Sequence, residues 1–139
     1  MRGVKGQDGT VTITNTHTPG KVEKTVTKKW DDANNQDGLR KNVNAYVCLF
    51  ADGEQVTKDI YGNSVSAIQK VGTKDSWTFK WSNLPKYKDG KEINYTVKEG
   101  TLTAGKFTEF DAKELAELGY TSNVDDKTLT VTNTHIPAK

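Results

Sequence analysis

The sequence has few of the residues that crosslink chains or carry catalysis, with one cysteine and two histidines in 139 residues. A single Cys48 cannot form a disulfide within the chain, so no disulfide framework holds this fold together. No stretch approaches the roughly 20 apolar residues that a membrane-spanning helix requires. Charge of one sign is also lacking, since 20 basic side chains are set against 18 acidic ones. This balance gives no electrostatic footprint for nucleic acid or for an anionic membrane surface.

Recognisable enzyme motifs are missing as well. The sequence contains no nucleophile elbow, no phosphate-binding loop and no cluster of metal ligands. The loop at residues 30–40 comes nearest to a calcium loop, but Asp32, Asn34 and Gln36 match only part of the alternate-ligand pattern and no glutamate follows. Cys48 has no histidine and acid partner in the sequence pattern, which favours a structural thiol over a nucleophile. We therefore expect no metal, no cofactor and no turnover chemistry.

A segment that occurs twice is the most informative feature that is present. Residues 10–21 read TVTITNTHTPGK and residues 128–139 read TLTVTNTHIPAK. Each copy alternates apolar and polar residues up to a proline, which is typical of a final β-strand leaving its domain. The duplication predicts that residues 1–20 hold the last strand of a preceding repeat plus a linker, and that residues 21–139 form one repeat. We expect a monomer in which residues 10–16 are available for a strand-mediated contact.

Alternating apolar and polar residues dominate the remaining chain and predict an all-β domain with one modest core. Residues 51–54 have the sequence of a hairpin turn. Residues 61–71 have a weaker pattern and are expected to continue the sheet, whereas residues 121–126 are expected to form turns. Trp77 and Trp81 share a strand face that predicts a core wall, with a carbohydrate-stacking surface as the alternative. The predicted strands cover residues 22–30, 42–50, 76–81, 93–99 and 127–134.

One short helix is expected to interrupt the strands. Asp111 and Glu114 have the spacing of a capping box, in which two side chains satisfy the free backbone donors at a helix start. Gly119 suits a helix end because it adopts a left-handed conformation without strain. The sequence therefore predicts a helix over residues 112–118.

Three polar residues occupy strand positions where the alternation predicts core. Lys28 lies between Val26 and Trp30, while Glu99 and Asn133 each end the apolar face of a later strand. Burial shifts a lysine toward the neutral amine and a carboxyl toward the neutral acid. On pattern alone, two simpler interpretations stay open. The three residues can be strand ends that reach solvent, or a buried ion pair with an asparagine hydrogen-bonded to it.

The three side chains are also the reactants of a known type of chemistry. If the first and last strands run side by side, the neutral amine of Lys28 can attack the side-chain carbonyl of Asn133. A protonated Glu99, hydrogen-bonded to that carbonyl oxygen, would polarise the amide and shuttle a proton to the departing ammonia. The product is an isopeptide bond, and proximity and desolvation would supply the activation. Lys29 is the nearest rival nucleophile, but it lies on the opposite face of the strand.

Five motifs together resemble a Cna B-type domain, the repeat of stalks and pilins in Gram-positive surface proteins, over about residues 22–137. In that family the lysine lies two residues before the first-strand tryptophan, the glutamate closes a YTVxE strand and the asparagine closes the last strand. These positions fall on Lys28, Glu99 and Asn133. The motifs are TKKWDDANNQDGLR, LFADGE, WTFKWSNLPKY, INYTVKE and TVTNTH.

The resemblance implies an Ig-like or transthyretin-like Greek-key β-sandwich with one short helical insertion. It implies a structural stalk repeat of a cell-surface adhesin or pilin, in which Lys28 and Asn133 are joined and Glu99 is the catalytic proton shuttle. Its partners would be neighbouring repeats, and its location the bacterial cell surface on a wall-anchored parent protein. The alternative is a ligand-binding adhesin module that contacts host matrix protein or glycan. The segment of residues 101–120 is longer than the corresponding segment of a minimal repeat.

Overall fold

The structure is a computed structural model that describes residues 20–137. The predicted remnant strand and its contact through residues 10–16 lie outside the described residues. Strands make up most of the described chain, with a short 3-10 turn (Arg40–Asn42) and one α-helix, α1 (Ala112–Glu117). The strands are β1 (Lys21–Asp31), β2 (Tyr46–Ala51), β3 (Glu54–Gln55), β4 (Ile68–Lys70), β5 (Ser76–Pro85), β6 (Tyr87–Lys88), β7 (Lys91–Glu92), β8 (Tyr95–Thr103), β9 (Lys106–Glu109), β10 (Thr121–Asp125) and β11 (Thr130–Thr134).

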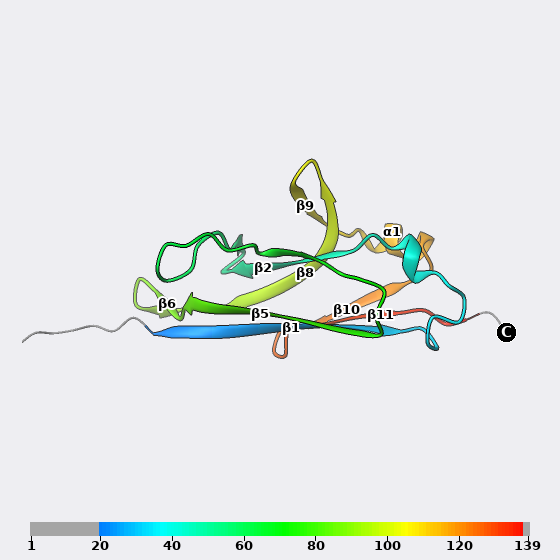
Figure 1. The fold of residues 1–139 in the computed structure, drawn as a ribbon, viewed down its shortest axis with the longest axis horizontal. Helices are drawn as coiled ribbons and strands as arrows, with labels where there is room; N and C mark the ends of the chain where they lie inside the picture. Colours follow the sequence, from blue (N-terminus) through cyan, green and yellow to red (C-terminus); the bar gives the residue numbers. More distant parts are fainter. Residues whose placement is uncertain (1–19, 138–139) are drawn as a thin grey trace, which may run out of the picture.

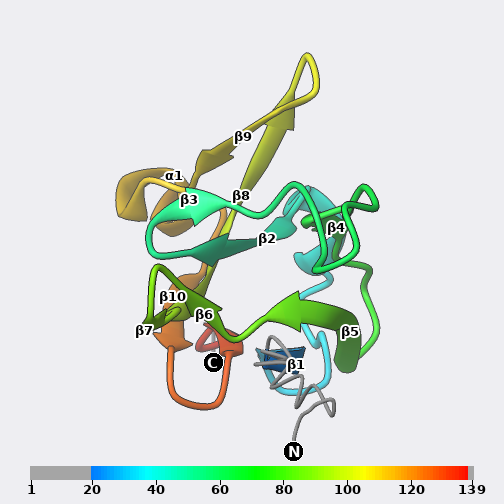
Figure 2. The same ribbon diagram turned by 90° about the vertical axis from the view of Figure 1, so that its left-hand side faces the viewer.

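Two sheets pack face to face, as the resemblance implied (Figure 2). One sheet has the strand order β10-β11-β1-β5, and the other has the order β3-β2-β8-β9 with β4 also paired to β2. Alternate residues of each strand face the opposite sheet and exclude water. The centre of the core contains the fully buried side chains of Val26, Val47, Leu49 and Val131. The predicted β-sandwich is therefore confirmed.

The first and last strands are parallel neighbours in the middle of the four-stranded sheet. Lys28 pairs with Val131, and Trp30 pairs with Asn133. Because paired residues and residues two apart on a strand share one face, Lys28 and Asn133 project to the same side of the sheet. The start of β1 and the end of β11 lie at opposite ends of the long axis (Figure 1). The strands thus lie side by side, as the crosslink hypothesis required.

The middle of the chain differs from its predicted boundaries. The strand predicted from residue 42 begins at Tyr46, because residues 40–42 form a 3-10 turn that ends at Val43. Of residues 61–71, expected to continue the sheet, only β4 pairs with β2. The hairpin turn at residues 51–54 is confirmed: Asp52 and Gly53 both have positive φ angles, of 49° and 86°.

The end of the chain holds a strand that the sequence pattern did not predict. Residues 121–126 were expected to form turns, but β10 pairs with β11 along its whole length. All of β10 is exposed, so it carries no apolar alternation by which to recognise it. The last strand begins at Thr130 and not at residue 127. The turn before it is stabilised by Asp125, whose carboxylate accepts hydrogen bonds from the backbone of Lys127 and Thr128.

The segment from residue 100 to residue 120 forms a hairpin followed by the predicted helix. Strand β8 continues past Glu99 to Thr103 and turns into β9, and this hairpin projects from the sandwich (Figure 1). The capping box of α1 is confirmed, since Asp111 accepts from the backbone of Lys113 and Glu114 accepts from the backbone of Asp111. Within residues 20–137, no helix has the length and apolar character needed to span a membrane.

Candidate functional site

The three polar residues that interrupt apolar strand faces meet inside the sandwich. Lys28 on β1 and Asn133 on β11 belong to one sheet, and Glu99 on β8 belongs to the other. Their exposed fractions are 0% for Lys28, 3% for Glu99 and 0% for Asn133. The interpretation that they are strand ends reaching solvent is therefore wrong. The structure brings together the three side chains that the sequence singled out.

Glu99 lies between the amine and the amide and contacts both. Its Oε1 accepts a hydrogen bond from Nδ2 of Asn133 at 2.8 Å, and its Oε2 lies 3.8 Å from Nζ of Lys28. The sequence hypothesis placed the carbonyl oxygen of Asn133 on Glu99, whereas here the amide nitrogen faces it. An ionised carboxylate can only accept hydrogen bonds, so it selects the nitrogen. Protonation makes Glu99 a hydrogen-bond donor as well.

The cluster leaves hydrogen-bonding capacity unused. Oε2 of Glu99 and Oδ1 of Asn133 are buried and have no hydrogen-bond partner among the described residues. The amine of Lys28 donates to the backbone carbonyl of Lys29 at 3.1 Å and lies 3.5 Å from the centre of the Trp30 ring. Buried polar atoms without partners destabilise a fold, and in native structures they are rare. The arrangement is therefore poorly suited to a purely stabilising role.

Burial also sets the protonation of the pair. Desolvation lowers the pKa of Lys28 to about 8, although the opposite charge of Glu99 acts against it. Desolvation likewise raises the pKa of Glu99, opposed by the charge of Lys28 and by hydrogen bonds from Asn133 and Ser122. Both shifts favour the neutral amine and the neutral acid. These are the forms that a nucleophilic attack and a proton donation require.

The rival nucleophile lies outside the cluster. Lys29 is exposed on the other face of β1, as its position in the alternation predicted. Its backbone carbonyl, however, accepts the hydrogen bond from the Lys28 amine. Asn15, which matches Asn133 in the duplicated segment, lies outside the described residues. Lys28 is thus the lysine that can reach the amide.

A second buried polar cluster, just beyond the end of β1, was not predicted from the sequence. Arg40 donates two hydrogen bonds to the carboxylate of Asp32, at 2.8 Å and 2.6 Å, and others to Asp75 and to the backbone of Thr73. The hydroxyl of Tyr120 also donates to Asp32, at 2.7 Å. The Arg40 guanidinium holds the pKa of Asp32 well below its usual range. Asp32 and Arg40 have opposite charges and lie in the same loop motif, which was a sign that they could pair. The alternation of apolar and polar residues, however, does not show how a loop folds back.

The loop that holds this cluster is the one that partly matched a calcium loop. Its turn formers act as predicted, since Asn34 and Asn35 adopt positive φ angles of 57° and 63°. Both carboxylate oxygens of Asp32 are engaged by the guanidinium of Arg40, which occupies the place where a cation would bind. Within residues 20–137 no group of His, Cys, Asp or Glu side chains has the arrangement of a metal site.

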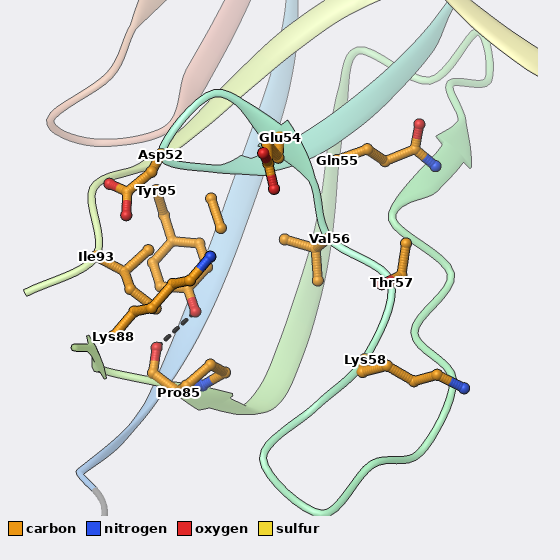
Figure 3. Close-up of a pocket in the computed structure, with 11 residues that line it drawn as sticks. Asp52, Glu54, Gln55, Val56, Thr57, Lys58, Pro85, Lys88, Ile93 and Tyr95 are labelled. Carbon is orange, nitrogen blue, oxygen red and sulfur yellow. Dashed lines mark hydrogen bonds between the residues drawn. The ribbon is translucent and has the colours of Figure 1, made fainter.

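A surface pocket of about 260 Å³ lies near the start of β1 (Figure 3). Pro85, which pairs with Lys21 of β1, accepts a hydrogen bond from the hydroxyl of Tyr95 inside this pocket. Its charged lining residues, such as Asp52 and Lys88, are exposed. The hydroxyl of the buried Tyr95 is already hydrogen-bonded to Pro85, so it is not free to bind a ligand. It is a weaker candidate for chemistry than the Lys28 cluster.

Comparison with known proteins agrees with the fold and with the motifs. The model of the Cna protein B-type domain family matches residues 24–134. The collagen adhesin of Staphylococcus aureus is 36% identical over 120 residues, which is 86% of this chain and 9% of the adhesin. The crystal structure of a single B repeat unit of the S. aureus collagen-binding surface protein has a TM-score of 0.57 at 33% identity, covering 87% of this chain and 54% of that one. A crystal structure of two such units has a TM-score of 0.58 at 30% identity, covering 88% of this chain and 25% of that one.

The chain is an immunoglobulin-like β-sandwich repeat of the kind found in surface adhesins. It belongs to the Cna B-type domain family, which confirms the resemblance seen in its motifs. It spans 9% of the collagen adhesin it matches and 54% of the single repeat unit. The family membership thus describes the matched domain and not the activity of the longer relatives.

Proposed function

We propose that this domain is a structural stalk repeat of a bacterial surface protein, locked by an isopeptide bond between Lys28 and Asn133. The observation that supports it is the buried contact of an amine, a carboxyl and an amide where β1, β8 and β11 meet. A buried ion pair kept for stability would hold its charges and fill its hydrogen bonds. This cluster favours neutral forms and leaves two oxygens without hydrogen-bond partners within residues 20–137.

The reaction needs only the three side chains. The neutral amine of Lys28 attacks Cγ of Asn133, so that a bond from Nζ to Cγ replaces the bond from Cγ to Nδ2. Glu99 donates a proton to the departing Nδ2 and accepts one from Nζ, which returns the carboxyl to its starting state. Amine and primary amide become a secondary amide and ammonia. Glu99 contacts both reactants, so the step is intramolecular, and because it consumes its own side chains it occurs once.

The position of the bond suits a domain under tension. In an array of repeats, neighbours connect through the start of β1 and the end of β11, which lie at opposite ends of the molecule (Figure 1). A pull on these ends shears the parallel pair. A covalent link from Lys28 to Asn133 would carry that load from one strand to the other and keep it off the rest of the sheet. The benefit is resistance to force and to proteases on an exposed cell surface.

Intact mass tests the proposal directly. The parent protein and Lys29→Ala are expected to fall short of their calculated masses by one ammonia, while Lys28→Ala and Asn133→Ala are expected to show their full calculated masses. Lys29→Ala is the matched control, because it removes a neighbouring amine that faces away. A peptide containing residues 28 and 133 should survive digestion of the parent as one species. Full calculated mass in the parent would refute the crosslink.

The alternative function is a ligand-binding adhesin module, and the pocket in Figure 3 is the observation in its favour. Collagen binding is named for the S. aureus relatives, which makes immobilised collagen the first probe. Saturable binding that is lost in Lys88→Glu, a change at the exposed pocket lining, would favour this alternative. A spacer repeat should bind neither collagen nor a glycan array.

A further inference from the structure

A second surface pocket, of about 290 Å³, leads directly to the buried cluster. Glu99 is part of its lining and is only 3% exposed, which places this carboxyl at the floor. The other lining residues come from β9, Phe110, α1 and β10, and all of these except β10 belong to the long segment of residues 101–120. Those at the mouth are exposed: Glu109, Ala112, Thr121, Ser122 and Val124.

Ser122 connects this pocket to the reacting groups. Its hydroxyl donates to Oε1 of Glu99 at 3.2 Å, the same oxygen that accepts from Nδ2 of Asn133 at 2.8 Å. The backbone register of β10 and β11 pairs Ser122 with Asn133, so the serine is held beside the amide by the sheet itself. The hydroxyl, the carboxyl and the leaving nitrogen thus meet at one point next to the pocket.

We propose that Ser122 is a positioning residue for crosslinking, and that the pocket it lines is the path by which ammonia leaves. The hydroxyl holds Oε1 of Glu99 against Nδ2 of Asn133, so that the proton is delivered to the departing nitrogen. This inference rests on the proposed bond between Lys28 and Asn133. It also assigns a role to the long segment of residues 101–120, which supplies two walls of the pocket and covers Glu99.

The burial of the reactants explains why a path is needed. Lys28 and Asn133 are 0% exposed, whereas Glu99 lines the pocket of about 290 Å³. Ammonia forms at Nδ2, against Oε1, and leaves as a neutral molecule because ammonium would lose its hydration inside the cluster. If ammonia stayed, it would be available to attack the new amide and reverse the reaction. Escape through the pocket makes the crosslink permanent.

The test for Ser122 is the rate of crosslinking in newly made protein. Cell-free synthesis is stopped with a translation inhibitor, and samples quenched in acid at intervals are analysed by intact mass. Ser122→Ala is expected to slow ammonia loss roughly three- to tenfold, the effect of one hydrogen bond. Ser122→Thr, which keeps the hydroxyl, and Asn123→Ala, the matched control at an exposed position of the same strand that does not line the pocket, should stay within about twofold of the parent. Circular dichroism checks that each variant folds.

The dependence of that rate on pH separates positioning from a general loss of structure. The hydrogen bond from Ser122 favours the carboxylate form of Glu99, so its removal should move the Glu99 limb of the profile to higher pH. Ser122→Thr should leave the limb in place. A parental rate and profile in Ser122→Ala would overturn the role of Ser122. A parent that never loses ammonia would instead overturn the proposed function.

The path is tested by closing the mouth of the pocket. Ala112→Trp places a large side chain on the exposed rim, whereas Lys113→Trp adds the same side chain at an exposed neighbour that does not line the pocket. Slower ammonia loss in Ala112→Trp than in Lys113→Trp supports the path. Equal rates in both variants and the parent would overturn it.

Discussion

Two buried polar clusters lie close together near the end of β1, and their hydrogen bonds are satisfied to different degrees. Arg40 and Asp32 are joined by two short hydrogen bonds, whereas Glu99 and Asn133 each keep one oxygen without a partner among the described residues. In the first cluster the pKa of Asp32 is pushed below its usual range and that of Arg40 above it. In the second, the pKa of Lys28 is lowered to about 8 and that of Glu99 is raised.

The side chain of Trp30 contacts both clusters. The amine of Lys28 lies 3.5 Å from the centre of its ring, and Cζ of Arg40 lies 5.6 Å from it. The pKa values of the two basic side chains beside the Trp30 ring thus shift in opposite directions. The guanidinium of Arg40 donates hydrogen bonds to carboxylate oxygens, whereas the amine of Lys28 donates to a single backbone carbonyl. Desolvation is the largest cause of the lowered pKa of Lys28, whereas the hydrogen bond to Asp32 is the largest cause of the raised pKa of Arg40. The balance between burial and hydrogen bonding therefore decides whether a buried group favours its charged or its neutral form.

The largest effect is expected from removing the proposed bond. Lys28→Ala removes a crosslink that would close a loop of roughly a hundred residues. The loop-closure entropy of such a crosslink corresponds to about 4 to 5 kcal/mol in the free energy of unfolding. The melting temperature should fall by on the order of 15 °C. Calorimetry of the parent, Lys28→Ala and Asn133→Ala measures this, with Lys29→Ala as the unchanged control. Glu99→Ala should leave Lys28 and Asn133 unreacted and melt with the other two variants. Equal melting across all of them would contradict the crosslink.

The next effect is expected from breaking the satisfied cluster. Arg40→Met leaves the carboxylate of Asp32 buried without its partner, which should destabilise the domain by about 3 kcal/mol in a urea titration. Lys41→Met, at an exposed neighbour, is the control and should change little. Adding Asp32→Leu to Arg40→Met should recover part of the loss, since an apolar pair needs no hydrogen bonds. Both variants should still lose ammonia, and a failure to do so would show that the two clusters act as one.

The smallest effect concerns an ion pair at the surface, between His135 and Asp37. Both hydrogen-bonding nitrogens of this histidine have partners, but the pair is only partly buried. The two ring nitrogens of His135 face the carbonyl of Gly119 at 2.6 Å and the carboxylate of Asp37 at 2.8 Å. Both partners only accept, so the ring donates from both nitrogens as an imidazolium. The hydrogen bond to Asp37, followed by the one to Gly119, raises the pKa of His135.

The sign of the resulting pH dependence follows from that shift. A group whose pKa is higher in the folded state than in the unfolded state stabilises the fold. This stabilisation is complete at pH values below the unfolded-state pKa and is lost as pH rises through the folded-state pKa. The melting temperature of the parent should therefore fall as pH rises above the ordinary histidine pKa of 6.5. Asp37→Asn and His135→Gln should flatten this fall in thermal melts at several pH values. An equally steep fall in all three proteins would refute the imidazolium.

The residues of the proposed crosslink could be singled out from the sequence because burial and polarity conflict at their positions. Lys28, Glu99 and Asn133 each break an apolar face, and a sandwich core makes such breaks rare. The helix after Asp111 was predictable for a similar local reason, since its capping box lies within a few residues. Features of this kind depend on residues that lie close together in the sequence.

The features that were missed depend on contacts between distant segments. Strand β10 is exposed throughout, so only its backbone pairing with β11 defines it. Ser122 gains its contact with Glu99 from that same register. Arg40 meets Asp32 because a loop with three consecutive positive φ angles, at residues 33–35, folds back. None of these contacts leaves a periodic signal along the chain.

The central pairing of β1 with β11 has a consequence for how the domain is made. Synthesis proceeds from the N-terminus, so β1 leaves the ribosome first and waits for the last strand before the middle of its sheet can close. Contacts of such long sequence separation form late in folding. A chain cut short before Asn133 has no amide to react, and a chain in which β11 docks wrongly has it out of reach. The proposed bond would therefore act as a proofreading mark, present only on repeats that were synthesised to the end and folded correctly.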